Sequence, residues 1–294
     1  MIRLSRDRAQ PAPHKLYDEV AEAAADVVLR RYSTSFGLAS RLLTGTVRTH
    51  VRNIYALVRV ADEVVDAPRP GGGVAGRSQL LADLHREVAH AVDTGHSANL
   101  VVHAFARTAR TCGIDAALYG PFFASMRMDL ERTEHDADSL ARYIHGSAEV
   151  VGLMCLRAFL VDTPDRDRQY ERLQDGASRL GAAFQKVNFL RDLGSDVDHL
   201  GRRDFPGLDI ERFDRATRDR LLDDIEADLE AAAVMIPSLP AGSRRAVCAA
   251  HLMFAELACR LRRTDPAVIR SRRVRVPAPR KAQLIAIALA RGAA

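Results

Sequence analysis

Two acidic residues share one face of a helix that the sequence predicts in its N-terminal part. The polar residues of this face are Tyr55, Arg59, Asp62 and Asp66. They lie four, three and four residues apart, and side chains at these separations stack above one another on an α-helix. The other residues of the segment are mostly apolar, which is typical of a buried helix. Buried charges are unfavourable unless they are compensated, and a divalent cation between Asp62 and Asp66 would compensate both.

A second face of the same kind occurs later in the chain. Its polar residues, three, four and four positions apart, are Gln185, Asn188, Asp192 and Asp196. Asparagine and carboxylate oxygens are ligands that suit Mg²⁺, and this ion often shares its coordination shell with substrate phosphates. The two faces together therefore predict a site for metal ions and a phosphate-containing substrate.

The chemistry that fits two such faces is the ionisation of an allylic diphosphate. Bound Mg²⁺ would neutralise the leaving group and lower the barrier to C–O cleavage, and the remaining carbocation would require a dry, apolar cavity. Arg59 and Arg191 lie near the acids in sequence and could hold diphosphate oxygens through charge-assisted hydrogen bonds. The alternative is two sets of structural Asp–Arg ion pairs, which leaves the matched spacing of the two faces unexplained.

The composition is typical of a soluble, all-α protein. The 294 residues are 47% hydrophobic and 28% charged, helix-forming residue types dominate, and strand-like alternation is rare. The formal net charge is +5, but basic and acidic residues are interleaved, which argues against nucleic-acid binding. The densest basic cluster, residues 270–281, could bind phosphate groups or form a solvated surface. The four cysteines lack metal-ligand spacing.

We expect a single domain located in the cytoplasm. Residues 1–13 are polar and contain prolines, so we predict that they are disordered and that residues 14–294 form the domain. The sequence shows neither a signal peptide nor an apolar run approaching about 20 residues, the length of a transmembrane helix. The glycine-rich stretch 67–78 interrupts the helical pattern and is predicted to be a mobile loop beside Asp62 and Asp66.

Two features leave alternatives open. The hydroxyl-bearing residues 33–35 precede an apolar run, which favours a helix N-cap over a phosphate-binding helix start. Gly146 and Gly152 interrupt the apolar segment 140–160, although a glycine inside a helix costs about 1 kcal/mol relative to alanine. Either something large approaches the chain at these glycines, or two helices pack closely there.

Five segments carry a resemblance to a known family. They are SFGLASRLL (35–43), YALVRVADEVVD (55–66), MRMDLERT (126–133), YIHGSAEVVGLM (143–154) and FQKVNFLRDLGSD (184–196). These segments resemble the squalene/phytoene synthase family, the head-to-head trans-isoprenyl diphosphate synthases, and look most similar to actinomycete phytoene synthases. The resemblance extends from about residue 32 to residue 280. It implies an isoprenoid-synthase helical bundle with a central apolar cavity and Mg²⁺ as the cofactor.

The resemblance also implies roles for individual residues. The metal ligands would be Asp62 and Asp66 on the first face and Asn188, Asp192 and Asp196 on the second. Contacts with diphosphate or with the reacting carbons would come from Ser35, Phe36, Tyr55, Arg59 and Arg191. Tyr143 and Gln185 would line the reaction centre, where Tyr143 would handle protons or stabilise cations. Arg272 or Arg273 would reach a diphosphate from the C-terminal side. The catalytic residues would be Tyr143 and the four aspartates.

The leading hypothesis is a Mg²⁺-dependent prenyltransferase, by default one that condenses two geranylgeranyl diphosphates head to head as a phytoene synthase does. His145 and Asp204 stand where the family pattern has tyrosines, so the second substrate stays open. The alternative is an enzyme of secondary metabolism that transfers a shorter prenyl group to an aromatic acceptor. A squalene-type synthase, a terpene cyclase and an inactive helical scaffold are less favoured. A lipophilic product could bring the enzyme into peripheral contact with membranes.

Overall fold

The computed structural model describes residues 13–33, 35–66, 73–200 and 205–291, without the side chains of residues 13, 35, 36 and 195–200. Of the segment predicted to be disordered, only Pro13 is described, and it begins helix α1. Residues 67–72 of the glycine-rich stretch and Asp204 also lie outside the described residues. Helix α4 already begins at Val74, so residues 74–78 are helical and the interruption is shorter than predicted.

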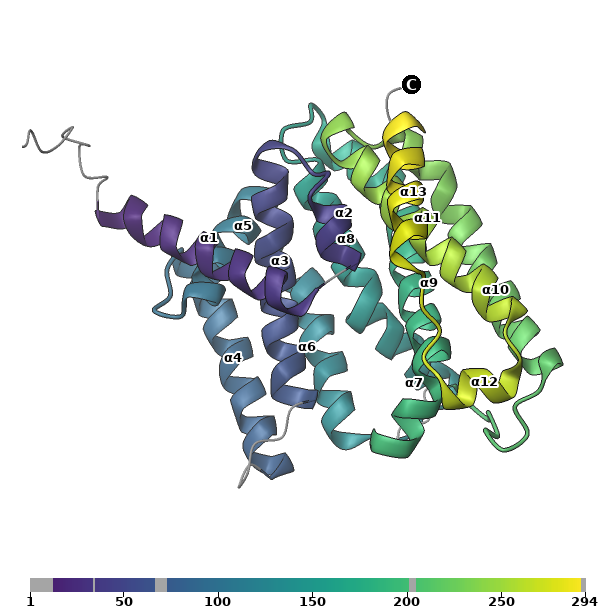
Figure 1. Cartoon of the computed structure of the whole chain (residues 1–294). Helices are drawn as coiled ribbons and strands as arrows, with labels where there is room; N and C mark the ends of the chain where they lie inside the picture. The colour runs from purple at the N-terminus through teal and green to yellow at the C-terminus, as the bar shows by residue number, and fades with distance from the viewer. Residues whose placement is uncertain (1–12, 34, 67–72, 201–204, 292–294) are drawn as a thin grey trace, which may run out of the picture.

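All regular elements of the described ranges are helices, which confirms the all-α prediction (Figure 1). Side chains cap several of them; Asn99 and Asp214, for example, accept hydrogen bonds from the first backbone N–H groups of α5 and α10. In chain order the elements are α1 Pro13–Tyr32, α2 Ser35–Ser40, α3 Gly45–Asp66, α4 Val74–Thr94, α5 Leu100–Cys112, α6 Ala116–Glu131, α7 Ala137–Ile144, the π-helical turn η1 His145–Glu149, α8 Val150–Phe159, α9 Arg166–Leu200, α10 Arg215–Met235, the 3₁₀ turn η2 Ile236–Ser238, α11 Ala241–Arg263, α12 Pro266–Ser271 and α13 Ala278–Arg291.

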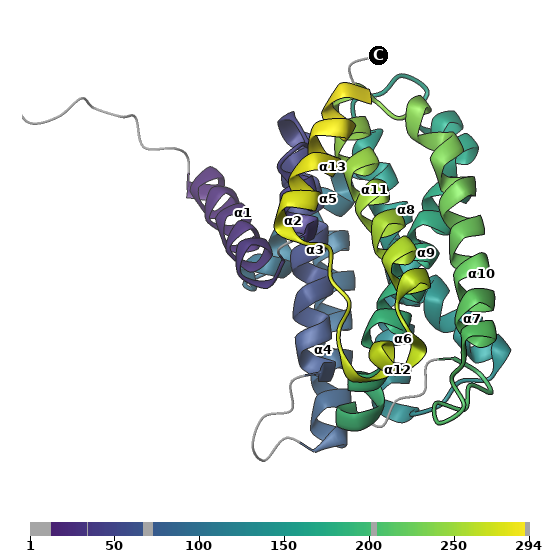
Figure 2. The ribbon, with the colours of Figure 1, turned by 45° about the vertical axis from the view of Figure 1, so that its right-hand side comes forward.

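Helices α3 and α9 carry the two acidic faces. Helix α3 packs against α1, α4, α5, α6 and α8, whereas α9 packs against α8, α10, α11 and α12. The short helix α12 lies against the C-terminal part of α9. Figures 1 and 2 both show α12 at the end of the bundle where α3 also ends. The acidic faces of α3 and α9 are therefore at the same end of the molecule.

The interior of the bundle is apolar. Its largest fully buried side chains include Leu57, Phe105, Phe122, Phe123 and Leu190. Burial of one such side chain contributes about 1.5–3 kcal/mol, so this core is the main source of stability. Across the described ranges, no helical segment combines the length and the hydropathy that a bilayer crossing requires.

Glycines allow the backbones of several helices to approach closely. A Cβ atom at Gly146 would clash with the carbonyl group of Pro121 in α6. A Cβ atom at Gly152 would lie 2.6 Å from the carbonyl oxygen of Ala177 in α9, inside van der Waals contact. Close helix packing therefore explains both glycines. The segment 140–160 is divided between α7, η1 and α8, and its π-helical turn is of a kind often found at functional sites.

Gly194 is the contact point between α9 and α12. A Cβ atom at this position would overlap the backbone carbonyl group of Arg270 in α12. Gly194 also lies between Asp192 and Asp196 of the second acidic face. The glycine therefore allows α12, and Arg273 just after it, to come directly over this face.

We predict that Gly194→Ala destabilises the protein by about 1–3 kcal/mol, the usual range for overpacking a close contact. The added methyl group would force α12 away from α9. The matched control is Gly76→Ala, because Gly76 lies inside α4 and, apart from its own helix backbone and chain neighbours, no described atom lies within 4 Å of its Cβ position. The control should be stabilised by up to about 1 kcal/mol through helix propensity. Urea unfolding followed by circular dichroism measures both variants, and equal stability would contradict the close contact.

Candidate active site

The first acidic face occupies the last two turns of α3. Asp62 is half-buried, and Asp66, the last residue of the helix, is exposed. Ala61 and Val65, their neighbours on the other side of the helix, are buried in the core. Helical periodicity thus turns an apolar stripe inward and leaves the two carboxylates where the core meets solvent.

Arg59 lies one turn before the aspartates and has two partners. Its guanidinium group pairs with the carboxylate of Glu63 and lies 4.6 Å from the centre of the Tyr32 ring. Its Nε atom is buried without a hydrogen-bond partner among the described residues. A buried, unsatisfied N–H group next to the acidic face is suited to binding an anion. The sequence analysis did not single out Glu63, although its i, i+4 relation to Arg59 is a recognisable signal.

Tyr55 lies one turn further into the helix and is half-buried. Burial raises its pKa, whereas a hydrogen bond with Ser33 and the charge of Arg59 act in the opposite direction. The phenol therefore keeps its proton near neutral pH. The Ser33 hydroxyl also accepts a 3.0 Å hydrogen bond from the backbone N–H of Gly37 in α2, which agrees with the N-cap interpretation of residues 33–35.

Asp192, on the second face, is held by two arginines. Arg191 donates to Oδ1 from its Nε at 2.9 Å, and its other guanidinium nitrogen contacts Oδ2. Arg273 donates to the same two oxygens at 2.8 and 3.1 Å. Only 18% of the Asp192 side chain is exposed, so these charge-assisted bonds compensate a carboxylate that has lost most of its water. The two C-terminal arginines considered are both exposed, and of the two it is Arg273 whose contact with this face is described.

For some of the other predicted residues, the structure describes the backbone but not the side chain. Gln185 and Asn188 are half-buried on α9, on the same helical face as Asp192. Asp196 continues this face along the backbone of α9, but its side chain lies outside the described residues. The same holds for the side chains of Ser35 and Phe36, whose backbone begins α2.

Tyr143 is buried near the end of α7, and its hydroxyl donates a 3.0 Å hydrogen bond to Oδ2 of Asp129 in α6. The ring lies between two others, with centroid distances of 5.1 Å to His135 and 5.9 Å to Phe189. Phe189 directly follows Asn188 in α9, so Tyr143 packs against the part of α9 that carries the second acidic face. The sequence analysis gave Asp129 no role. Its only signal was its place in the segment MRMDLERT.

Arg77 is a third residue that sequence reasoning missed. Its Nη1 atom donates a 2.5 Å hydrogen bond to the backbone carbonyl of Val65, which belongs to the last turn of α3. Basic side chains commonly satisfy the free carbonyl groups at helix C-termini. Arg77 therefore fixes the turn that carries Asp62 and Asp66, from the other side of the glycine-rich segment.

His145 begins the π-helical turn and is turned toward solvent. Its side chain is 49% exposed, and Nδ1 lies 2.9 Å from Oε2 of Glu149. A histidine in place of the expected tyrosine therefore changes the protein surface at this position and leaves the side chains of the interior unchanged.

The donor set fits a divalent cation that binds together with a phosphate group. Among the described residues, no three His, Cys, Asp or Glu side chains converge on one point. Mg²⁺ is usually held by one or two carboxylates, with waters and substrate phosphates completing the shell. Asp62 and Asp66 on one helix and Asn188 and Asp192 on the other provide oxygen ligands of this kind, at the same end of the bundle.

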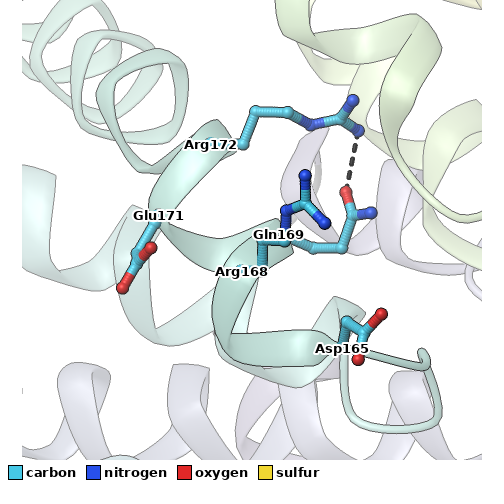
Figure 3. A pocket seen from close by; sticks show the side chains of 5 residues that line it. All are labelled: Asp165, Arg168, Gln169, Glu171 and Arg172. Atoms are coloured by element: carbon cyan, nitrogen blue, oxygen red, sulfur yellow. Dashed lines mark hydrogen bonds between the residues drawn. The ribbon is translucent and has the colours of Figure 1, made fainter.

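A surface depression of about 600 Å³ lies elsewhere, at the start of α9 (Figure 3). The residues that line it are Asp165, Arg168, Gln169, Glu171 and Arg172. Twenty residues separate Arg172 from Asp192, which corresponds to about 30 Å along a straight helix. The depression is therefore distinct from the candidate active site.

Comparison with known proteins agrees with this arrangement. Residues 29–280 match the model of the squalene/phytoene synthase family. The chain is 29% identical to a phytoene synthase from Mycobacterium tuberculosis over 295 positions, which cover 92% of this chain and 91% of that enzyme. It is 28% identical to a 15-cis-phytoene synthase from Synechocystis over 227 positions, which cover 75% of this chain and 66% of that enzyme.

A solved structure has the same fold. The crystal structure of a dehydrosqualene synthase in complex with a ligand superposes with a TM-score of 0.78. The two sequences are 22% identical, and the match covers 95% of this chain and 99% of the other. The family match spans most of the chain and includes both acidic faces, so the chain belongs to the squalene/phytoene synthase family of prenyl-transferring enzymes.

Proposed function

We propose that this chain is a Mg²⁺-dependent prenyltransferase that ionises an allylic diphosphate and joins two prenyl units head to head. The default substrate is geranylgeranyl diphosphate, with a phytoene-like hydrocarbon as the product. The observation that carries this proposal is that two acidic helix faces and their arginines lie at one end of an apolar bundle. The expected setting is the cytoplasm, with peripheral membrane contact through the lipophilic product.

Different residues of the two faces would bind the metal ion and the diphosphate. The metal would be held by Asp62, Asp66, Asn188, Asp192 and Asp196. When bound, Mg²⁺ withdraws negative charge from the leaving diphosphate and so promotes C–O cleavage. Arg59, with its unsatisfied Nε, and Arg273, at the edge of the second face, would donate hydrogen bonds to the diphosphate oxygens.

The apolar side chains beyond these faces would protect the carbocation. Phe184 of α9 stacks on Phe254 of α11 with a centroid distance of 3.8 Å, and Phe189 lies beside Tyr143. Such rings exclude water, and their electron-rich faces stabilise cations. The exposed position of His145 supports a second prenyl diphosphate as the acceptor, because the substitution there does not reshape the interior.

The test is to incubate the purified protein with geranylgeranyl diphosphate and Mg²⁺ and to measure diphosphate release and hydrocarbon products by gas chromatography–mass spectrometry. We expect a phytoene-like product, and we expect chelation with EDTA to stop diphosphate release until Mg²⁺ is restored. Release that continues without divalent metal would contradict the metal assignment. Alkylation of an added aromatic acceptor, without any condensed hydrocarbon, would contradict the proposed acceptor.

We predict that Asp192→Asn lowers kcat for diphosphate release by about 10²–10³, the typical loss when one group that stabilises developing charge is removed. The substitution keeps the shape of the side chain but removes the charge that a metal ion requires. Asp175→Asn on the same helix is the matched control, because Asp175 is 79% exposed and pairs only with Arg179 among the contacts described for it. A control that loses as much activity as Asp192→Asn would show that the loss is not specific to the site.

We also predict that Arg77→Ala raises the Mg²⁺ concentration for half-maximal activity by roughly threefold to tenfold, the equivalent of one hydrogen bond. Without Arg77 the last turn of α3 would fray, which would misplace Asp62 and Asp66 while leaving the saturated rate nearly unchanged. Arg77→Lys should restore part of the affinity. The control is Arg86→Ala, an exposed arginine on the same helix. An unchanged Mg²⁺ dependence in Arg77→Ala would contradict this role.

A further inference from the structure

Two residues of α6 hold Tyr143 at two points. The Ser125 hydroxyl donates a 3.1 Å hydrogen bond to the backbone carbonyl of Tyr143, and the Asp129 carboxylate accepts a 3.0 Å hydrogen bond from its phenol. Ser125 and Asp129 are four residues apart, so they lie on the same face of α6. One stripe of α6 therefore fixes both the backbone and the hydroxyl end of this tyrosine.

Asp129 is at a position where its own helix disfavours a carboxylate. It lies in the last turn of α6, two residues before Glu131 ends the helix. The C-terminus of a helix carries partial negative charge, which disfavours carboxylates there. Ser125, by contrast, is fully buried. Together with Pro121 it contacts Gly146 so closely that this contact sets the distance between α6 and the segment formed by α7 and η1.

We propose that Asp129 is a positioning residue that sets the direction of the Tyr143 hydroxyl group. Because the carboxylate accepts the phenol hydrogen, the lone pairs of the phenol oxygen face away from Asp129. The hydrogen bond to a charged acceptor also makes that oxygen more electron-rich. The phenol oxygen, beside Phe189 and the second acidic face, is then directed to stabilise positive charge on the reacting carbons. This inference rests on the proposed function.

The test is a double-mutant cycle of Asp129→Ala and Tyr143→Phe, with kcat and KM measured separately. Asp129→Ala should lower kcat roughly tenfold, the effect of one hydrogen bond to a charged group, and leave KM unchanged. In the Tyr143→Phe background, which has no hydroxyl to orient, Asp129→Ala should cause no further loss of kcat. Asp129→Asn retains an oxygen that accepts the phenol hydrogen and should keep kcat within about threefold of the wild type.

The controls separate this role from a general effect on folding. Asp138→Ala removes an exposed acid from the first turn of α7 and should leave kcat unchanged. Losses that multiply in the double mutant would overturn the proposal, because Asp129 would then act independently of Tyr143. If Asp129→Ala does not fold, the cycle is run with Asp129→Asn. A tenfold loss of kcat in Asp129→Asn that persists in the Tyr143→Phe background would also overturn the proposal. A wild-type protein without turnover would instead overturn the proposed function and this inference together.

Discussion

The structure depends on compensating negative charge at the edge of an apolar bundle. Asp192 has lost most of its contact with water, and a lone carboxylate in such a position would be costly. Two guanidinium groups compensate this negative charge, one from Arg191 on the same helix and one from Arg273, which follows α12. On α3 the exposed end of the helix and the Arg59–Glu63 pair serve the same purpose. The acids are thus held in place within reach of the core.

This compensation is possible only because the backbones approach closely. Arg273 reaches Asp192 because Gly194 leaves room for the carbonyl of Arg270. Tyr143 meets Asp129 because Gly146 allows η1 to lie against α6. The glycines within the motif segments therefore have a structural explanation. They set the distances between helices, and those distances decide which charged groups meet.

Helical periodicity predicted the two acidic faces well, since the spacing of Asp62 and Asp66, and of Asn188 and Asp192, fixes their relative direction on any α-helix. It also predicted the all-α fold. It could not choose between Arg272 and Arg273, because that choice depends on where α12 ends and how it packs on α9. The partner of Arg273 is 81 residues away in sequence, and no local pattern contains that contact.

Other functional contacts escaped prediction for related reasons. Arg77 has no recognisable motif, because its partner is a backbone carbonyl and any basic residue at that place in space would serve. Asp129 gained meaning only when the connection 132–136 and helix α7 brought Tyr143 back to it. The π-helical turn His145–Glu149 shifts the register of the residues that follow it, so a regular helix over 140–160 would give the wrong relative direction for side chains of α7 and α8.

The same arginines have a consequence for how metal and diphosphate would bind. A divalent cation that approaches Asp192 alone must compete with Arg191 and Arg273, which already hold both of its oxygens. A diphosphate that approaches alone meets the negative charge of the acids. With both present, the carboxylates would be free to hold the cation, and Arg191 and Arg273 could donate hydrogen bonds to the phosphate oxygens. Each ligand would then increase the affinity for the other, as thermodynamic linkage requires. The pairing of acids with arginines that compensates charge in the bundle is therefore also what would make metal binding depend on the substrate.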